Sequence, residues 1–460
     1  MRYVSTRGDA PELGFTDVLL SGLARDGGLY VPERWPDLPD LSAAPGYVDV
    51  AVEVIGTFTG DDLTRDELHA LCADAYGAFR HPATCPLVQI GDRQWLLELF
   101  HGPTLAFKDV ALQLVGRMFD HVLAQRGQRL TIVGATSGDT GSAAIDGVRH
   151  CERVDIVILY PYGRTSEVQR RQMTTVESPN VHAIAVDGTF DDCQDLVKAM
   201  FNDERFRDEL QLSAVNSINW ARVMAQVVYY VTASTALDGT PTFSVPTGNF
   251  GNVLAGWIAQ RMGAPIADFI VASNSNDILT RFINEADMST RDVVPTLSPS
   301  MDIQVSSNFE RLLFEMNGRD GGMTAEQLQR FRAAGRLDVE ADQRAEFVEG
   351  TFRAAKFDDA ATIAEIGRVY ADTGLQIDPH TATGTAAARA LAGEHPVVSL
   401  ATAHAAKFPD AVTEATGVTP ELPPHLADLF DRPERTETLP NDLATVQSFV
   451  RSASRVARSA

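Results

Sequence analysis

Hydrophobic and polar positions divide the chain into a short first part and a longer second part. Over residues 63–79 apolar side chains recur at helical spacing, which predicts a helix. Residues 80–86 then contain two prolines, Pro82 and Pro86, a composition typical of a linker. We therefore expect a small N-terminal domain over residues 1–85 and a larger catalytic region over residues 86–460.

Beyond residue 86, short apolar runs alternate with loops and helical patterns. Such alternation is typical of an α/β fold in which mainly parallel sheets are flanked by helices. The expected strands are 94–100, 129–133, 154–160 and 242–245, and the expected helices are an amphipathic one from about residue 107, then 141–150 and 253–262. The polar segment 319–373 is expected to be helical and to form an insertion or a cover.

The loop after the first of these strands ends in a lysine. It reads His-Gly-Pro-Thr-Leu-Ala-Phe-Lys-Asp over residues 101–109 and places Lys108 at the expected start of a helix. The positive end of the peptide dipoles disfavours a protonated amine there. An amine whose pKa falls from about 10.4 toward about 7–8 can serve as nucleophile and base. Lys108 is therefore the candidate catalytic residue, and a surface lysine in a first turn is the alternative.

Only three other lysines occur in the chain, which narrows the choice of a catalytic amine. Lys198 has a mid-helical position typical of a solvated charge. Lys356 lies in the polar segment that is expected to be helical. Lys407, in Ala-His-Ala-Ala-Lys-Phe-Pro, is the second candidate for an active-site cation.

A second loop, residues 134–141 (Gly-Ala-Thr-Ser-Gly-Asp-Thr-Gly), joins an expected strand to an expected helix. Its backbone N–H groups, hydroxyls and helix start are typical of an anion cradle. A nicotinamide-binding loop is the alternative, but it requires an acidic residue at the end of the next strand. That strand ends in Tyr160 and Pro161, so the alternative is weakened.

A third loop, residues 246–252 (Pro-Thr-Gly-Asn-Phe-Gly-Asn), also precedes an expected helix. Its glycines and the helix start favour phosphate binding, and a tight turn with capping asparagines is the alternative. An NTPase carries its lysine inside such a loop, whereas Lys108 lies far away along the chain. Two anion-binding loops and a distant lysine favour a cofactor with its own phosphate and an aldehyde.

Composition limits the classes of function. Hydrophobic residues make up 44% and charged residues 22%, as in folded globular proteins. A net charge of -23 argues against general nucleic-acid binding. The apolar stretch 223–237 is too short to span a bilayer, and the N-terminus lacks the apolar core of a signal peptide. Scattered cysteines favour a reducing compartment over a zinc or disulfide framework. We expect a cytoplasmic protein without a metal, a membrane partner or a nucleic-acid partner.

The three loops, in this order, resemble those of the threonine synthase family. Segments 26–32, 177–194, 216–222 and 402–408 are also similar, so the resemblance covers most of the chain. It implies the type II fold of pyridoxal-phosphate enzymes, which is that of tryptophan synthase β, preceded by a small N-terminal domain. It also implies pyridoxal 5'-phosphate as the cofactor.

The resemblance assigns roles by position. Lys108 would bind the cofactor's aldehyde covalently, and Thr402 would face its pyridine nitrogen. The cofactor phosphate would be held by Gly248, Asn249, Phe250, Gly251 and Asn252. The candidates for binding substrate are Thr136, Ser137, Asp139, Thr140, Arg222 and Lys407, with Arg311 and His380 as weaker choices. Asp139 stands where many relatives of the wider fold carry asparagine.

The implied reaction converts O-phospho-L-homoserine and water into L-threonine and phosphate. Threonine dehydratase and cysteine synthase share the fold and are alternatives. A nicotinamide-dependent oxidoreductase and an inactive binding protein are alternatives from other classes.

Overall fold

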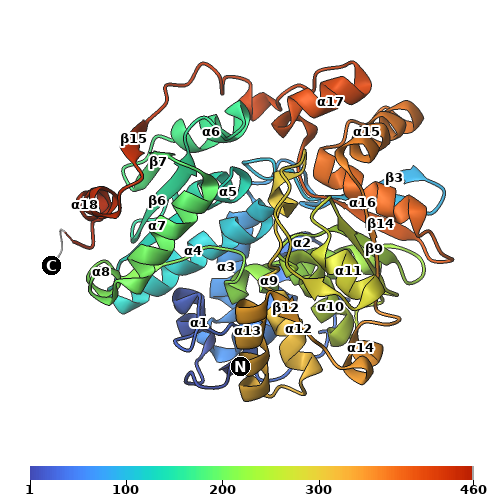
Figure 1. The fold of residues 1–460 in the computed structure, drawn as a ribbon, viewed down its shortest axis with the longest axis horizontal. Coiled ribbons are helices and arrows are strands. Elements are labelled where there is room, and N and C mark those ends of the chain that lie inside the picture. Colours follow the sequence, from blue (N-terminus) through green and yellow to red (C-terminus); the bar gives the residue numbers. More distant parts are fainter. Residues whose placement is uncertain (458–460) are drawn as a thin grey trace.

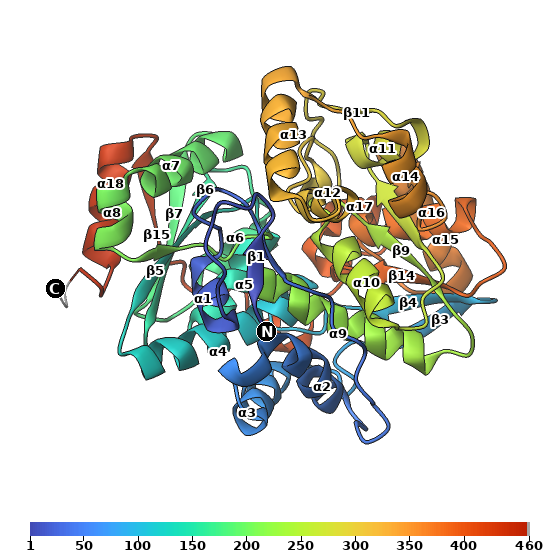
Figure 2. The ribbon, with the colours of Figure 1, turned by 90° about the horizontal axis from the view of Figure 1, so that it is seen from below.

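Two parallel sheets form the framework of the computed structural model, which describes residues 1–457. The larger sheet has the order β13-β10-β9-β14-β4-β3, and only β3 runs antiparallel to its neighbour. The smaller sheet, β15-β7-β6-β5-β8, is parallel throughout. Figure 2 shows the sheets on opposite sides of the molecule, with α4, α5 and α9 between them. This confirms the expected α/β architecture of mainly parallel sheets flanked by helices.

The strands of the larger sheet are β3 Leu87–Gly91, β4 Gln94–Glu98, β9 Thr242–Pro246, β10 Phe269–Ser273, β13 Phe352–Lys356 and β14 Val397–Ala401. Those of the smaller sheet are β5 Leu130–Ala135, β6 Val154–Pro161, β7 Val181–Asp187, β8 Leu212–Ser213 and β15 Thr436–Pro440. The helices that carry or flank the site are α4 Lys108–Arg126, α5 Asp139–Val148, α6 Glu167–Thr174, α9 Trp220–Ala236, α10 Gly251–Met262 and α16 Pro379–Ala390, with the short 3-10 helices η2 Pro299–Met301 and η3 Ala405–Lys407. The expected strands and helices of the catalytic region are thus confirmed to within two or three residues at each end.

Further helices flank the two sheets (Figure 1). They are α7 Phe190–Asn202, α8 Glu204–Glu209, α11 Ile278–Glu285, α12 Phe309–Met316, α17 Pro409–Thr416 and α18 Leu443–Ala453, with η4 Pro424–Leu426. After α17 the chain crosses from the larger sheet back to the smaller one, where β15 adds the outer strand. Within the described residues, no helix is both long and apolar enough to cross a membrane.

The N-terminal part packs on α9. It contains β1 Tyr3–Ser5, α1 Phe15–Ser21, β2 Tyr30–Pro32, α2 Tyr47–Thr59, η1 Gly60–Asp62 and α3 Arg65–Tyr76. The expected helix at 63–79 is α3, which starts where Thr64 and Glu67 form a capping box. The hydroxyl of Tyr3 donates to the Phe58 carbonyl at 2.8 Å and accepts from Trp220 Nε1 at 3.1 Å. The N-terminal part therefore shares its core with α9, and the boundary at residue 85 stays a prediction.

Segment 319–373 differs from its expected form. Three helices are present, α13 Gly321–Ala334, α14 Ala341–Phe347 and α15 Asp359–Thr373. However, β12 Arg336–Leu337 pairs with β11 Met288–Ser289, and β13 adds an edge strand beside β10, so the segment is more than an insertion or a cover. Only Phe352 and Ala354 of β13 are buried, too few apolar residues to mark a strand in the sequence. Lys356 consequently lies on a strand rather than a helix.

The first half of α4 is buried on every side. All residues from 108 to 116 are buried, so this half lacks the exposed face of the amphipathic helix that was expected. The reason is its place between the two sheets and against α5. A methyl group on Gly116 would lie 2.0 Å from the carbonyl oxygen of Gly147, so the two helices approach too closely for any side chain there.

We predict that Gly116→Ala destabilises the protein by about 1–3 kcal/mol or more, because α4 and α5 must separate to admit the methyl group. Urea unfolding measures the change. Gly393→Ala is the matched control, since a methyl group there would meet only Arg353 Nη1, at 3.9 Å. Equal effects of the two substitutions would contradict the close helix contact.

Candidate active site

Lys108 lies where two neighbouring parallel strands end. Its loop follows β4, and the loop of Thr402 follows β14, the strand beside it. The two loops are joined by backbone hydrogen bonds, from Phe107 N–H to the Thr402 carbonyl at 2.8 Å and from His404 N–H to the Leu105 carbonyl at 3.0 Å. Lys108 then opens α4, as predicted. The expected amine and the expected partner of the pyridine nitrogen are thus brought together.

Thr104 fixes the start of this loop. Its N–H and its hydroxyl donate to the two carboxyl oxygens of Asp109, at 2.8 and 2.7 Å. Burial raises the pKa of Asp109 to about 7, although these two hydrogen bonds oppose the rise. The Thr104 carbonyl accepts from Lys407 Nζ at 2.8 Å. The loop is therefore held from both sides before Lys108 begins the helix.

The amine of Lys108 is buried among charged groups from three other elements. Nζ lies 3.3 Å from Asp139 Oδ2 on α5 and 3.2 Å from Ser300 Oγ on η2. Burial lowers the pKa of Lys108; the Asp139 carboxylate opposes this, and the charges of Lys407 and Arg222 reinforce it. The sequence argument from the helix start gave the same direction, but the main cause is burial.

Asp139 is a fully surrounded carboxylate. Its Oδ1 accepts from Lys407 Nζ at 2.9 Å and from Gln169 Nε2 at 2.8 Å. Burial alone would raise the pKa of Asp139, but the ammonium groups of Lys407 and Lys108 hold it well below its usual value. Asp139 is therefore the ionised partner of two buried lysines.

Lys407 has no exposed surface, and both of its contacts are internal. It lies beside Asp139 in the candidate site, and its role as a cation for the substrate stays a prediction. Its bonds to Asp139 and Thr104 favour a role in holding the carboxylate over direct contact with a substrate.

The second loop uses one of its hydroxyls for its own shape. Thr136 Oγ1 accepts from the N–H groups of Gly138 and Gly141, at 3.0 and 2.9 Å. Ser137 and Thr140 are half-buried at the start of α5. Of the predicted substrate-binding hydroxyls, these two have the more open position, and Thr136 shapes the loop.

The third loop packs tightly on η2. A methyl group on Gly248 would lie 2.9 Å from the Ser300 carbonyl oxygen, so only glycine permits this approach. The Gly248 carbonyl accepts from Ser306 Oγ at 2.7 Å, and the Asn249 carbonyl accepts from Asn308 Nδ2 at 3.1 Å. Because both carbonyls are already bonded to side chains of the neighbouring segment, the backbone N–H groups of the third loop are the groups that can bind an anion.

The start of α10 completes the third loop. Phe250 has a left-handed backbone (φ +62°) and precedes Gly251, the first residue of the helix. Asn252 Oδ1 accepts from the hydroxyls of Tyr229 and Tyr230, while its buried Nδ2 has no hydrogen-bond partner among residues 1–457. The free amide and the unpaired N–H groups of a helix start fit a phosphate.

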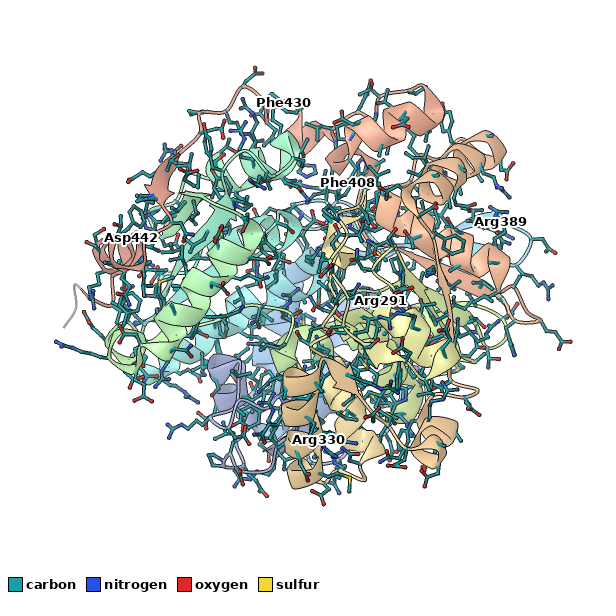
Figure 3. The ribbon with its side chains drawn as sticks, viewed as in Figure 1. Arg291, Arg330, Arg389, Phe408, Phe430 and Asp442 are labelled. Atoms are coloured by element: carbon teal, nitrogen blue, oxygen red, sulfur yellow. The ribbon has the colours of Figure 1, made fainter. Side chains whose placement is uncertain are left out.

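A buried hydrogen-bond chain links Thr402 to Ser300. Thr402 N–H donates to Thr381 Oγ1 at 3.2 Å, and the Thr381 hydroxyl donates to Asp378. Asp378 also bonds His380 Nδ1 at 2.8 Å, and His380 Nε2 accepts from Ser300 N–H at 3.2 Å. The ring of Phe408, labelled in Figure 3, packs on His380 with centroids 5.0 Å apart.

Three residues of the site, Ser300, Asp378 and Gln169, were not predicted from the sequence. Asp378 is the N-cap of α16, and the same carboxylate also orients His380. Ser300 and Gln169 lie outside the three glycine-rich loops. Their position depends on tertiary packing, and no local spacing indicates it.

The two buried arginines that were candidates for binding substrate differ in their contacts. Arg311 donates to the carbonyls of Tyr30 and Ile218, at 3.1 and 2.7 Å, so it joins structural segments. Arg222 donates to the Val215 carbonyl at 2.9 Å, keeps a buried Nε without a partner, and forms no ion pair within the part of the chain that the structure describes. Burial lowers the pKa of Arg222 only to about 10, so it stays charged at neutral pH. Arg222 therefore retains capacity to bind an anion.

Family models match three consecutive parts of the chain. They are described as threonine synthase N terminus, over residues 2–76, pyridoxal-phosphate dependent enzyme, over residues 85–346, and threonine synthase, C-terminal, over residues 381–450.

Individual proteins match over nearly the whole length. The threonine synthase of Pseudomonas aeruginosa is 53% identical over 98% of both chains. A crystal structure of threonine synthase from Brucella melitensis with pyridoxal phosphate bound has a TM-score of 0.96 and 52% identity, and covers 99% of this chain and 100% of its own. The yeast threonine synthase structure has a TM-score of 0.92 and 37% identity over 98% of both chains. The expected type II fold is thereby confirmed.

We predict that Lys407→Met destabilises the protein by about 3–5 kcal/mol at pH 7, because it leaves the buried Asp139 carboxylate without its closest cation. The lowered pKa of Asp139 means that its ionised form stabilises the fold above about pH 4 and loses this effect as the pH falls further. The difference between native protein and variant should therefore shrink below about pH 4.

Urea unfolding at several pH values tests this prediction. Lys198→Met is the matched control, because Lys198 is exposed and its pair with Asp195 lies at the surface. A pH-independent loss in Lys407→Met would contradict the assigned charge on Asp139.

Proposed function

The chain belongs to the threonine synthase family of pyridoxal-phosphate-dependent enzymes, and from this premise we propose that it converts O-phospho-L-homoserine and water into L-threonine and phosphate. The observation that carries the proposal is the buried amine of Lys108, 3.3 Å from Asp139 Oδ2 and 3.2 Å from Ser300 Oγ, at the meeting point of the three loops. Burial lowers the pKa of Lys108. Such an amine can act as nucleophile and base at neutral pH.

The residues present fit pyridoxal phosphate. We propose that Lys108 binds it covalently, that Gly248, Asn249, Phe250, Gly251 and Asn252 hold its phosphate, and that Thr402 presents a neutral hydroxyl to its ring nitrogen. The unpaired Nδ2 of Asn252 and the helix start of α10 support the phosphate site. When bound, the cofactor supplies an electron sink for the carbon that carries the substrate's amine.

Lys108 would then move protons. Its flexible four-carbon stem allows one amine to reach both Cα and Cβ of a substrate. Asp139 cannot compete as a base, because its pKa is held well below the usual range. Proton transfer at both carbons is thus assigned to one residue. Phosphate is lost from Cγ, and water adds at Cβ.

Substrate binding is assigned to groups around this amine. We propose that Ser137 and Thr140, with the N–H groups of the loop shaped by Thr136, bind the substrate's carboxylate. Asp139 contributes a negative charge to the pocket, and its partner Lys407 contributes a positive one. Arg222, with a free Nε, is proposed to bind the substrate's phosphate.

Location and domain organisation are also proposals. The four buried, unpaired cysteines (Cys72, Cys85, Cys151 and Cys193) fit the cytoplasm, where thiols stay reduced. We propose the N-terminal domain over residues 1–85 and the catalytic region over residues 86–460. No observation favours a dehydratase, a cysteine synthase, a nicotinamide enzyme or an inactive binding protein.

We predict that the full chain with pyridoxal phosphate absorbs violet light and that borohydride fixes the cofactor on the peptide of Lys108. Lys108→Ala should lose this labelling and the release of phosphate from phosphohomoserine. Peptide mass spectrometry and a phosphate assay measure the two outcomes. Label on Lys407 would overturn the assignment, and the exposed Lys198 gives the background.

We predict that Arg222→Met raises the KM for phosphohomoserine about tenfold or more, because a hydrogen-bonded charge pair to phosphate is lost. Covalent capture of the cofactor on Lys108 should still occur, at a somewhat higher pH, because the Arg222 charge helps to lower the pKa of Lys108. Arg330→Met, on α13 at the lower edge of Figure 3, is an exposed control. An unchanged KM in Arg222→Met would refute contact with the substrate phosphate.

A further inference from the structure

The two lysines bound to Asp139 are not held equally. Lys407 Nζ lies 2.9 Å from Oδ1, within the range of a strong charge-assisted hydrogen bond, whereas Lys108 Nζ lies 3.3 Å from Oδ2. Gln169 also bonds Oδ1, so the carboxylate is turned toward Lys407. Of the two ammonium groups, Lys108 is therefore the one that can leave.

Ser300 occupies the space beside this looser contact. Its hydroxyl lies 3.2 Å from Lys108 Nζ and 3.4 Å from Asp139 Oδ2. A hydroxyl is both donor and acceptor, whereas an ionised carboxylate only accepts. Ser300 can accept from the ammonium form of Lys108 while it donates to Asp139, and it can instead donate to the neutral amine. The neutral amine keeps N–H groups that can still donate to Asp139, but its lone pair needs a donor, and of these two side chains only Ser300 can supply one.

We propose that Ser300 is a further catalytic residue, whose hydroxyl keeps the free amine of Lys108 hydrogen-bonded in both protonation states, and that His380 and Asp378 position it. The inference rests on the proposed function, since it concerns the amine that captures the cofactor. Capture joins Nζ to the aldehyde carbon and releases one water, and it requires the amine without its extra proton.

The positioning residues act through the backbone of Ser300. Because His380 Nε2 accepts from Ser300 N–H, the proton of the neutral ring is on Nδ1, which donates to Asp378. Both side chains are buried, with 3% of His380 and none of Asp378 exposed. The other oxygen of Asp378 accepts from Thr381, which in turn accepts from Thr402 N–H. One carboxylate therefore sets the position of both Ser300 and Thr402.

Four groups set the charge balance at this amine. Asp139 on α5 favours the ammonium form of Lys108, while Lys407 on η3 and Arg222 on α9 disfavour it. In its protonated form, His380 on α16 would also lower the pKa of Asp139. Removal of the Ser300 hydroxyl takes away the donor to the neutral amine and leaves Asp139 in place. The protonation equilibrium of Lys108 then shifts toward the ammonium form.

The test follows capture of pyridoxal phosphate by the full chain after the cofactor has been removed. The rise of violet absorbance gives the rate between about pH 6 and 10. Ser300→Ala should capture about tenfold more slowly than the native protein near neutral pH, with its pH profile moved to higher pH. Ser300→Thr, which keeps the hydroxyl, should stay within about threefold. Ser298→Ala, which loses a hydroxyl from the same loop without touching Lys108, should match the native profile.

Two further variants separate positioning from packing. His380→Leu removes the acceptor for Ser300 N–H and should reproduce the shifted profile, while His380→Gln, whose carbonyl can accept, should shift it less. Melting temperatures identify variants that only lose stability. If His380→Leu is less stable but keeps the native pH profile, its positioning role is rejected.

The outcomes distinguish this inference from the function on which it rests. A native protein that captures no cofactor would overturn the proposed function itself. A native protein that captures it, beside a Ser300→Ala variant with the same rate and pH profile, would overturn only the role of Ser300. Equal slowing in Ser298→Ala and Ser300→Ala would also overturn it, because a disturbed loop would then explain both.

Discussion

A buried carboxylate between two ammonium groups is the constraint on which the site depends. An unpaired Asp139 would be costly at this depth, and so would two adjacent lysine charges. Together the carboxylate and the two ammonium groups compensate one another. The carboxylate is shared unequally between the two lysines, because Lys407 and Gln169 both bind its Oδ1. The charge of Asp139 is thus satisfied by a lysine that stays, and Lys108 is free to react. The arrangement explains why an acidic residue can occupy position 139 without trapping the amine of Lys108.

The sheet explains how such distant residues meet. Strands β4 and β14 lie side by side and parallel, so their following loops bring Lys108 and Thr402 to one edge. The third loop arrives from β9, the next strand of the same sheet, and the second from β5 of the smaller sheet. Loop η2 lies against the third loop, where Gly248 permits its close approach. The two sheets therefore contribute separate parts of one charged site.

The strand-and-helix pattern and the three loops were predictable because each has a local signal. Lys108 at a helix start and the glycines of residues 246–252 are of this kind. The edge strand β13 was not predictable, since only two of its residues are buried. The partnership of Lys407 with Asp139 and the place of Ser300 were equally hidden, because they arise from contacts between residues more than a hundred positions apart. Local patterns thus predicted the position of Lys108, the proposed reacting amine, at a helix start, whereas tertiary packing determines its surroundings.

The most direct test of this account is a crystal structure of the full chain after borohydride has fixed the cofactor. We expect continuous density from Lys108 Nζ to the cofactor, with Lys407 still within hydrogen-bonding distance of Asp139 Oδ1. A structure in which Lys407 has left Asp139 to contact the cofactor or a bound phosphate would contradict the account.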